Sequence, residues 1–181
     1  TPTVIIGTDY KSIISEMEAF GEYTKTNSIV LYQLPFYKGS KKFSMSYINY
    51  MLKHELGHKY VVELLGRKRI EEIRNKDIDS FKFTSEGIAE IFSLGMTKDS
   101  SEHLGGLRRP ESYIQLFPDA PGLYQIYGHL FLSSIFENIP KKDLGKAFNY
   151  VLNNPPKLSH VLKDPKSYAS SYRNEVVKGI K

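Results

Sequence analysis

Two histidines four residues apart, with a glutamate directly after the first, form the string HELGH at residues 54–58. On a helix, residues i and i+4 lie on one face about 6 Å apart along the axis, so His54 and His58 can direct both imidazoles at one metal ion. Glu55 lies roughly 100° away around the axis, off the metal but near a metal-bound water. The spacing therefore indicates a catalytic zinc site with Glu55 as general base.

Such a site needs a third protein ligand, because catalytic zinc has three and leaves the fourth position to water. The chain has no cysteine, so the ligand must be a histidine or a carboxylate. The extended pattern HExxHxxGxxH is excluded, because the required Gly and His positions hold Val61 and Leu64. The string SEGIAE offers Glu86 as ligand, and Glu90, four residues on, as acceptor for the outward ring nitrogen of His54.

HELGH followed by FTSEGIAE resembles the gluzincin zinc metallopeptidases, the thermolysin-like and aminopeptidase-like group. In that group the HExxH helix is followed by a helix that carries the glutamate ligand. The resemblance covers residues 3 to 95 and implies that His54, His58 and Glu86 bind Zn²⁺ while Glu55 serves as base and proton shuttle. The gap of 28 residues between His58 and Glu86 is longer than in many members.

Relatives in this group often carry Tyr-x-x-Gly in a later helix, where the tyrosine hydroxyl stabilises the oxyanion at the scissile carbonyl. An ungapped match to LYQIYGHLFL makes Tyr124 the catalytic candidate, with Tyr127 second and His129 third. Alignment on Gly128 would put Gln125 in the role instead. Packing in an aromatic core is an equally good interpretation of either tyrosine, and His129 on a Leu/Phe-rich helix is more often a core residue than a ligand.

The resemblance implies hydrolysis of peptide bonds by a metal-activated water, with a peptide or an unfolded protein as substrate. No G-x-M-x-N string, which reads the amino terminus in related aminopeptidases, precedes HELGH, so an endopeptidase is the better expectation. The alternative is a non-catalytic or latent zinc-binding protein of the same fold that binds peptides or uses the metal structurally. SIVLYQLP at 28–35 would be the edge strand to which an extended peptide adds.

The hydrophobic pattern predicts strands at 3–7 and 28–35 and helices at 9–23, 46–66, 83–96, 124–139 and 141–154, with a charged hairpin-like or helical insert at 67–80. Thr84 or Ser85 is the expected N-cap of the glutamate helix.

These elements favour an α+β, two-lobed zincin-like fold with the active-site cleft between the lobes. Residues 1–66 would form an N-terminal lobe with a small mixed β-sheet and the HExxH helix. Residues 67–181 would form a mostly helical C-terminal lobe with the glutamate helix, and together the lobes would make one compact catalytic domain.

The net charge of +5 comes from scattered basic clusters, and no nucleic-acid-binding motif accompanies it, so no nucleic-acid partner is expected. No apolar run reaches the ~20 residues that span a bilayer, so no transmembrane segment is expected and the protein should be soluble. The compartment, cytoplasmic or secreted after removal of a signal, and the oligomeric state stay open.

Overall fold

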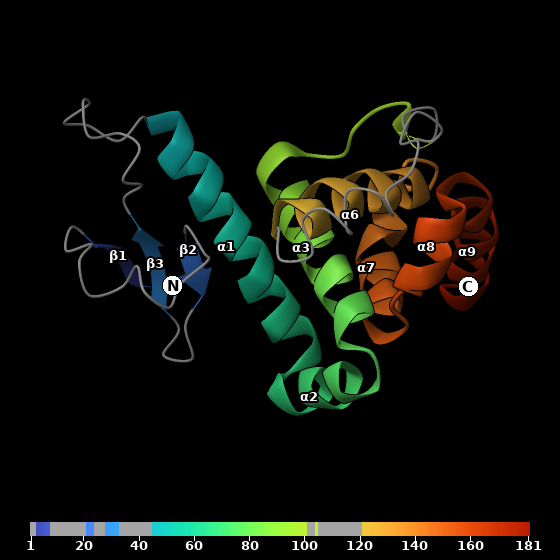
Figure 1. The fold of residues 1–181 in the computed structure, drawn as a ribbon, viewed down its shortest axis with the longest axis horizontal. Coiled ribbons are helices and arrows are strands. Elements are labelled where there is room, and N and C mark those ends of the chain that lie inside the picture. Colours follow the sequence, from blue (N-terminus) through green and yellow to red (C-terminus); the bar gives the residue numbers. More distant parts are fainter. Residues whose placement is uncertain (1–2, 8–20, 24–27, 33–44, 101–103, 105–120) are drawn as a thin grey trace.

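The computed structural model describes residues 3–7, 21–23, 28–32, 45–100, 104 and 121–181 (Figure 1). Its strands are β1 (Thr3–Gly7), β2 (Gly21–Tyr23) and β3 (Ser28–Tyr32). Its helices are α1 (Met45–Leu65), α2 (Arg67–Lys76), α3 (Ile78–Leu94), α6 (Pro121–Phe136), the 3₁₀ turn η2 (Lys141–Asp143), α7 (Leu144–Asn153), α8 (Leu158–Lys163) and α9 (Pro165–Gly179).

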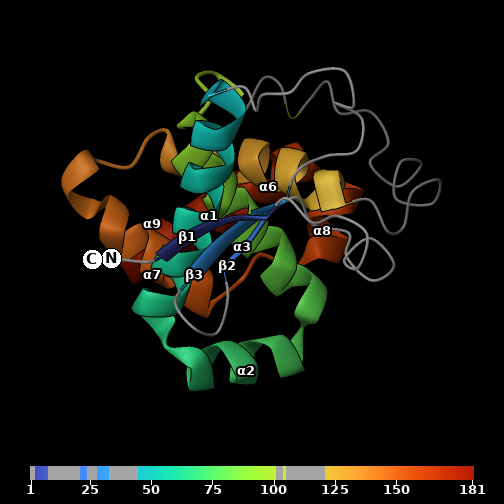
Figure 2. The same ribbon diagram turned by 90° about the vertical axis from the view of Figure 1, so that its left-hand side faces the viewer.

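The expected α+β, two-lobed fold is wrong. From Met45 onward the described residues lie mainly in helices and include no strand. The three short strands lie on one side of α1, while α3, α6 and the later helices lie on the other (Figures 1 and 2). The buried core that the structure describes comes from the helices. From Met45 onward the described part of the chain is therefore built on packed helices rather than on a mixed α+β lobe.

The small sheet has the strand order β1-β3-β2. β3 pairs in parallel with β1 and antiparallel with β2, so it is the central strand. The expectation that 28–35 contains an edge strand open to a substrate peptide is therefore wrong, since both sides of β3 are already paired. The helix expected at 9–23 falls outside the described residues, except that Gly21–Tyr23 form β2.

The boundaries of α1 agree with the predicted helix at 46–66 to within one residue. The next stretch is helical, as α2, and α3 then begins at Ile78, well before the predicted N-cap at Thr84 or Ser85. The cap is Asp77, whose carboxylate accepts hydrogen bonds from the Ser80 backbone N–H at 3.0 Å and the Ser80 hydroxyl at 2.7 Å. An acidic cap satisfies the free N–H groups of a first turn, so the helix starts there.

α3 is the central helix of the described part, with α1 packed on one side and α6 on the other (Figure 1). Both crossings bring backbones into contact. A Cβ built on Gly57 of α1 would lie 2.6 Å from the Ala89 Cα of α3. A Cβ on Gly87 of α3 would lie 2.5 Å from the Gly128 carbonyl carbon of α6. Glycine at these positions allows helices to approach more closely than any other residue does.

The hydrophobic core lies among α3, α6, α7 and α9, with contributions from the end of α1. Its largest fully buried side chains are Phe83, Phe131, Phe136, Ile88, Leu104, Leu132, Ile135, Leu152, Val61 and Val151. Each contributes about 1.5–3 kcal/mol by burial, so this cluster holds α3 and α6 rigidly.

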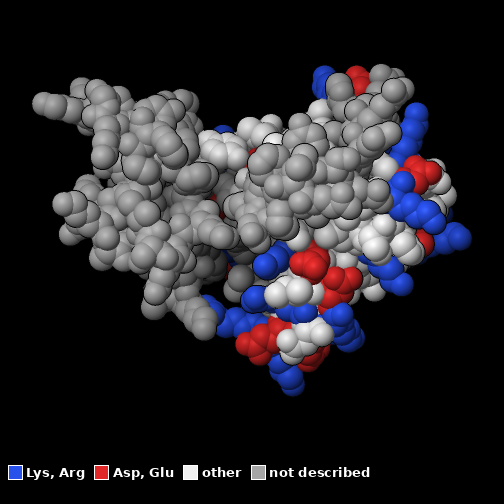
Figure 3. All heavy atoms as spheres, viewed as in Figure 1, with Lys and Arg blue, Asp and Glu red and all other residues white. Residues whose placement is uncertain are grey.

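The surface of α2 carries Lys and Arg interspersed with Glu rather than a patch of one sign, as the lower part of Figure 3 shows. In the part of the chain that is described, no helix is both long enough and apolar enough to cross a membrane.

Candidate metal centre

His54 and His58 extend from the same face of α1, as their spacing predicts. Their Nε2 atoms are 3.2 Å apart, and the two rings meet edge to face with centroids 4.8 Å apart. The His54 side chain is only 4% exposed, whereas that of His58 is 22% exposed. The pair is thus buried on one side and accessible on the other.

Glu86 of α3 completes the group. One of its oxygens lies 3.3 Å from His54 Nε2, the other lies 3.5 Å from His58 Nε2, and its side chain is 26% exposed. One ligand atom from each of the three residues lies within 4.8 Å of the other two. The structure therefore brings His54, His58 and Glu86 together as a group able to hold a metal ion.

The spacing of these atoms can be compared with what zinc requires. Zinc binds nitrogen and oxygen at about 2.0–2.1 Å in a tetrahedron, whose ligands are then about 3.3–3.4 Å apart. The two Nε2 atoms, 3.2 Å apart, agree with that value, and they lie 3.3 and 3.5 Å from the two different oxygens of Glu86. Two imidazoles and a carboxylate are also a donor set that zinc accepts, so the residues fit this metal.

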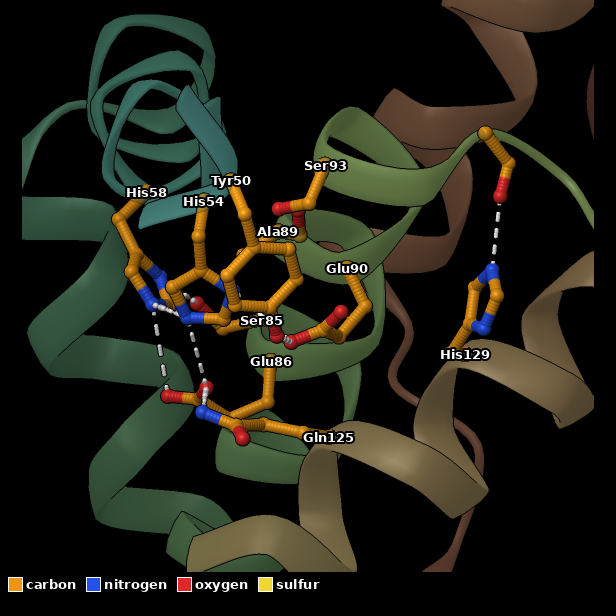
Figure 4. Close-up of polar contacts among 11 residues, drawn as sticks. Tyr50, His54, His58, Ser85, Glu86, Ala89, Glu90, Ser93, Gln125 and His129 are labelled. Atoms are coloured by element: carbon orange, nitrogen blue, oxygen red, sulfur yellow. Dashed lines mark hydrogen bonds and ion pairs between the residues drawn. The ribbon is translucent and has the colours of Figure 1, made fainter. Parts of the chain in front are cut away.

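Each of the three groups has a polar partner behind it (Figure 4). His54 Nδ1 lies 3.1 Å from a Glu90 oxygen, which also accepts a 2.5 Å hydrogen bond from the Tyr50 hydroxyl. His58 Nδ1 lies 3.2 Å from the Ser85 hydroxyl. With polar groups beside both Nδ1 atoms, the two Nε2 atoms are directed at the shared position, as in metal-binding histidines.

The electrostatics of the group favour a positive charge within it. Burial alone would lower the pKa of His54, but its contacts with Glu86 and Glu90 outweigh burial and raise that pKa to about 9. Burial alone would raise the pKa of Glu86, but its contacts with His54 and His58 hold that pKa well below its usual range. Glu90 likewise has a lowered pKa, because hydrogen bonds from His54 and Tyr50 outweigh its burial. Ionised carboxylates around a buried imidazole are an environment that a metal ion also satisfies.

Glu55, the proposed general base, is 2% exposed on α1. Its carboxylate acts electrostatically on the adjacent His54 ring and contributes to the raised pKa of that histidine. Its part in proton transfer stays a prediction.

The contacts that Tyr124 and His129 of α6 make lie outside the His54–His58–Glu86 group. The Tyr124 hydroxyl donates to Asp79 at 3.3 Å, and Asp79 lies seven residues before Glu86, about 10 Å along the α3 axis. Tyr127 is partly buried against the hydrophobic core. His129 is buried, and its Nε2 lies 2.7 Å from the Gly95 carbonyl oxygen, so its ring faces the end of α3 (Figure 4).

α6 does bring Gln125 to the group, and its Nε2 donates to a Glu86 oxygen at 3.3 Å. Sequence reasoning weighed Gln125 only as a substitute for the tyrosine, and it missed Tyr50 and Ser85. Two of the three had a usable signal, because Tyr50 lies four residues before His54 on one helical face and Ser85 directly precedes the ligand glutamate. No sequence pattern indicated Gln125, because its position depends on how α6 is rotated against α3.

Comparisons of the chain with known protein families, with curated proteins and with solved structures found no match. The resemblance to gluzincins therefore rests on the residues of the two motifs alone.

Proposed function

We propose that this chain is a zinc-dependent metalloendopeptidase in which His54, His58 and Glu86 hold the metal. The observation that carries the proposal is the convergence of these three side chains, which place one ligand atom each within 4.8 Å of the other two. The partial exposure of His58 and Glu86 gives this side of the group access to solvent. Among the described residues the group offers three ligands, one fewer than the four of a structural zinc site.

Bound zinc would supply a water of lowered pKa and would polarise a substrate carbonyl. Glu55 is the carboxylate proposed to take the proton from the attacking water and to deliver it to the leaving amine. Glu90, with Tyr50 behind it, holds the His54 ring by its Nδ1 side. Ser85 does the same for His58.

The expected substrate is an internal peptide bond of an unfolded protein, because the motif with which related aminopeptidases read a free amino terminus is missing. Strand addition to β3 does not provide the docking site, since both of its sides are paired. Substrate recognition is therefore assigned to other parts of the chain.

Two variants test separate parts of this proposal. Glu55→Gln should keep stoichiometric zinc, by metal analysis of the purified protein, and should lose about 10²–10⁴-fold of its rate on labelled casein. Glu86→Ala should lose zinc itself, because the remaining two imidazoles are too few to retain it.

The wild-type protein decides between the enzyme and its alternative. Zinc binding without casein cleavage would favour a non-catalytic or latent peptide-binding protein. Absence of zinc binding after incubation with the metal would contradict both the enzyme and the non-catalytic zinc-binding protein.

A further inference from the structure

We infer that Gln125 is a positioning residue whose side-chain amide orients the Glu86 carboxylate and thereby raises the affinity of the centre for zinc. The inference rests on the proposed function, since it assumes that Glu86 binds the metal. Nothing in the two motifs assigns this part to Gln125, which lies on α6, 39 residues beyond Glu86.

The contact itself has the chemistry of an orienting hydrogen bond. Gln125 Nε2 lies 3.3 Å from Glu86 Oε2. An ionised carboxylate only accepts hydrogen bonds, so the glutamine must present its NH₂ group there. Hydrogen bonds to an ionised partner are stronger than neutral ones. The amide can therefore hold the Glu86 carboxylate in place.

The same contact restricts how the carboxylate can turn. Glu86 Oε2 faces His54 Nε2 at 3.3 Å, while Oε1 faces His58 Nε2 at 3.5 Å. A donor on Oε2 from the α6 side opposes rotation of the carboxylate away from the two imidazoles. The Glu86 side chain is partly exposed, so without this donor it would have more rotational freedom to lose on binding.

The backbone contact between α3 and α6 explains why Gln125 can reach Glu86. Gly87, which directly follows Glu86, touches the backbone of Gly128, which lies three residues, or about one turn, after Gln125. A Cβ on Gly128 would lie 2.5 Å from the Phe83 carbonyl oxygen, so the helices are already as close as glycine allows. This crossing fixes Gln125 beside Glu86 independently of the metal.

The test compares Gln125→Leu, which keeps the size of the side chain and removes the donor, with Ser133→Ala. Ser133 lies further along α6, is buried, and accepts a 3.2 Å hydrogen bond from the Thr97 N–H, outside the metal group. Zinc affinity is measured by competition with a chromophoric chelator. The absorption spectrum of the cobalt-loaded protein reports ligand geometry, and melting of the metal-free protein reports folding.

Gln125→Leu should bind zinc about 10-fold more weakly and change the cobalt spectrum, as expected for loss of a partner behind a metal ligand, with metal-free melting unchanged. Ser133→Ala should bind zinc as the wild type does, even if it melts earlier. Gln125→Asn has an amide that is one methylene too short to reach Glu86, so it should behave as the leucine variant does. It replaces the leucine variant in the test if that variant folds poorly.

Wild-type zinc affinity and spectrum in both Gln125 variants would overturn the inference and leave the proposed function standing. An equal loss of affinity in Ser133→Ala would also overturn it, because helix packing would then explain the effect. Failure of the wild-type protein to bind zinc would instead overturn the proposed function.

Discussion

α3 crosses α1 and α6 through the same kind of glycine-mediated backbone contact, but the two crossings have different roles. At the α1–α3 crossing, Gly57 meets Ala89, and each helix carries metal-binding candidates beside the contact. At the α3–α6 crossing, Gly87 meets Gly128, and α6 contributes a hydrogen-bond donor together with much of the hydrophobic core. The first crossing therefore sets the distance between ligands, and the second joins the site to the core. A perturbation at each should have a different balance of effects on stability and on metal binding.

The largest loss of stability is expected at the α3–α6 crossing. In Gly87→Ala the new methyl would lie 2.5–2.9 Å from backbone atoms of Gly128, which cannot move by changing a rotamer. We expect a loss of about 3 kcal/mol in the free energy of unfolding, measured by urea denaturation of the metal-free protein, because overpacking exceeds the gain of about 1 kcal/mol in helix propensity. Zinc affinity should fall by no more than the about 10-fold expected for loss of the Gln125 contact, since the distance between α1 and α3 is unchanged.

Gly145 of α7 provides the matched control for that variant. A Cβ at this position meets no atom within 4 Å, so Gly145→Ala should stabilise the protein by about 0.5–1 kcal/mol. A Gly87→Ala protein as stable as Gly145→Ala would show that the α3–α6 backbones do not touch.

A smaller loss of stability but a larger loss of metal is expected at the α1–α3 crossing. In Gly57→Ala the methyl would lie 2.6 Å from the Ala89 Cα and 3.3 Å from the Phe92 Cβ, and α1 would have to move outward. We expect about 2 kcal/mol less stability and at least about 10-fold weaker zinc binding, because two imidazoles are carried away from Glu86. Urea denaturation measures the loss of stability, and competition with a chelator measures the loss of zinc affinity. If Gly57→Ala and Gly87→Ala lost stability and affinity in the same ratio, the distinction between the crossings would be lost.

The smallest effect in this series is expected from Glu90→Gln, which leaves both crossings intact. The amide keeps the size of the side chain but removes the charge that lies 3.1 Å from His54 Nδ1. Zinc affinity should fall about 10-fold, or about 1.4 kcal/mol, with little change in melting of the metal-free protein. Unchanged affinity in titration calorimetry would mean that His54 is oriented by packing alone.

The part of the site that is local in sequence could be predicted from it. His54 and His58 share a face because any helix places residues i and i+4 together, and SEGIAE marked Glu86 by its motif. The choice among Tyr124, Gln125 and Tyr127 depends on how α6 is rotated against α3. That rotation follows from the contact between Gly87 and Gly128, which no periodicity in either helix reveals.

The overall fold was less predictable for a related reason. The strand at 28–35 was expected at the edge because that is its place in the resembled group, but pairing partners are distant in sequence and place β3 at the centre. The start of α3 was also missed. Thr84 and Ser85 are good caps in isolation, yet Asp77 already holds the first turn, and Thr84 donates to the Ser80 carbonyl oxygen within the helix instead.

The short helix α2 lies between the two segments that carry the metal-binding candidates, but its residues take no part in the group. Its position at the periphery, at the bottom of Figure 1, separates the length of this connector from the geometry of the site. Whole turns could be gained or lost there over evolutionary time while the imidazoles and the carboxylate kept their places. A pattern that demands a fixed interval between HExxH and the third ligand would therefore pass over chains built in this way.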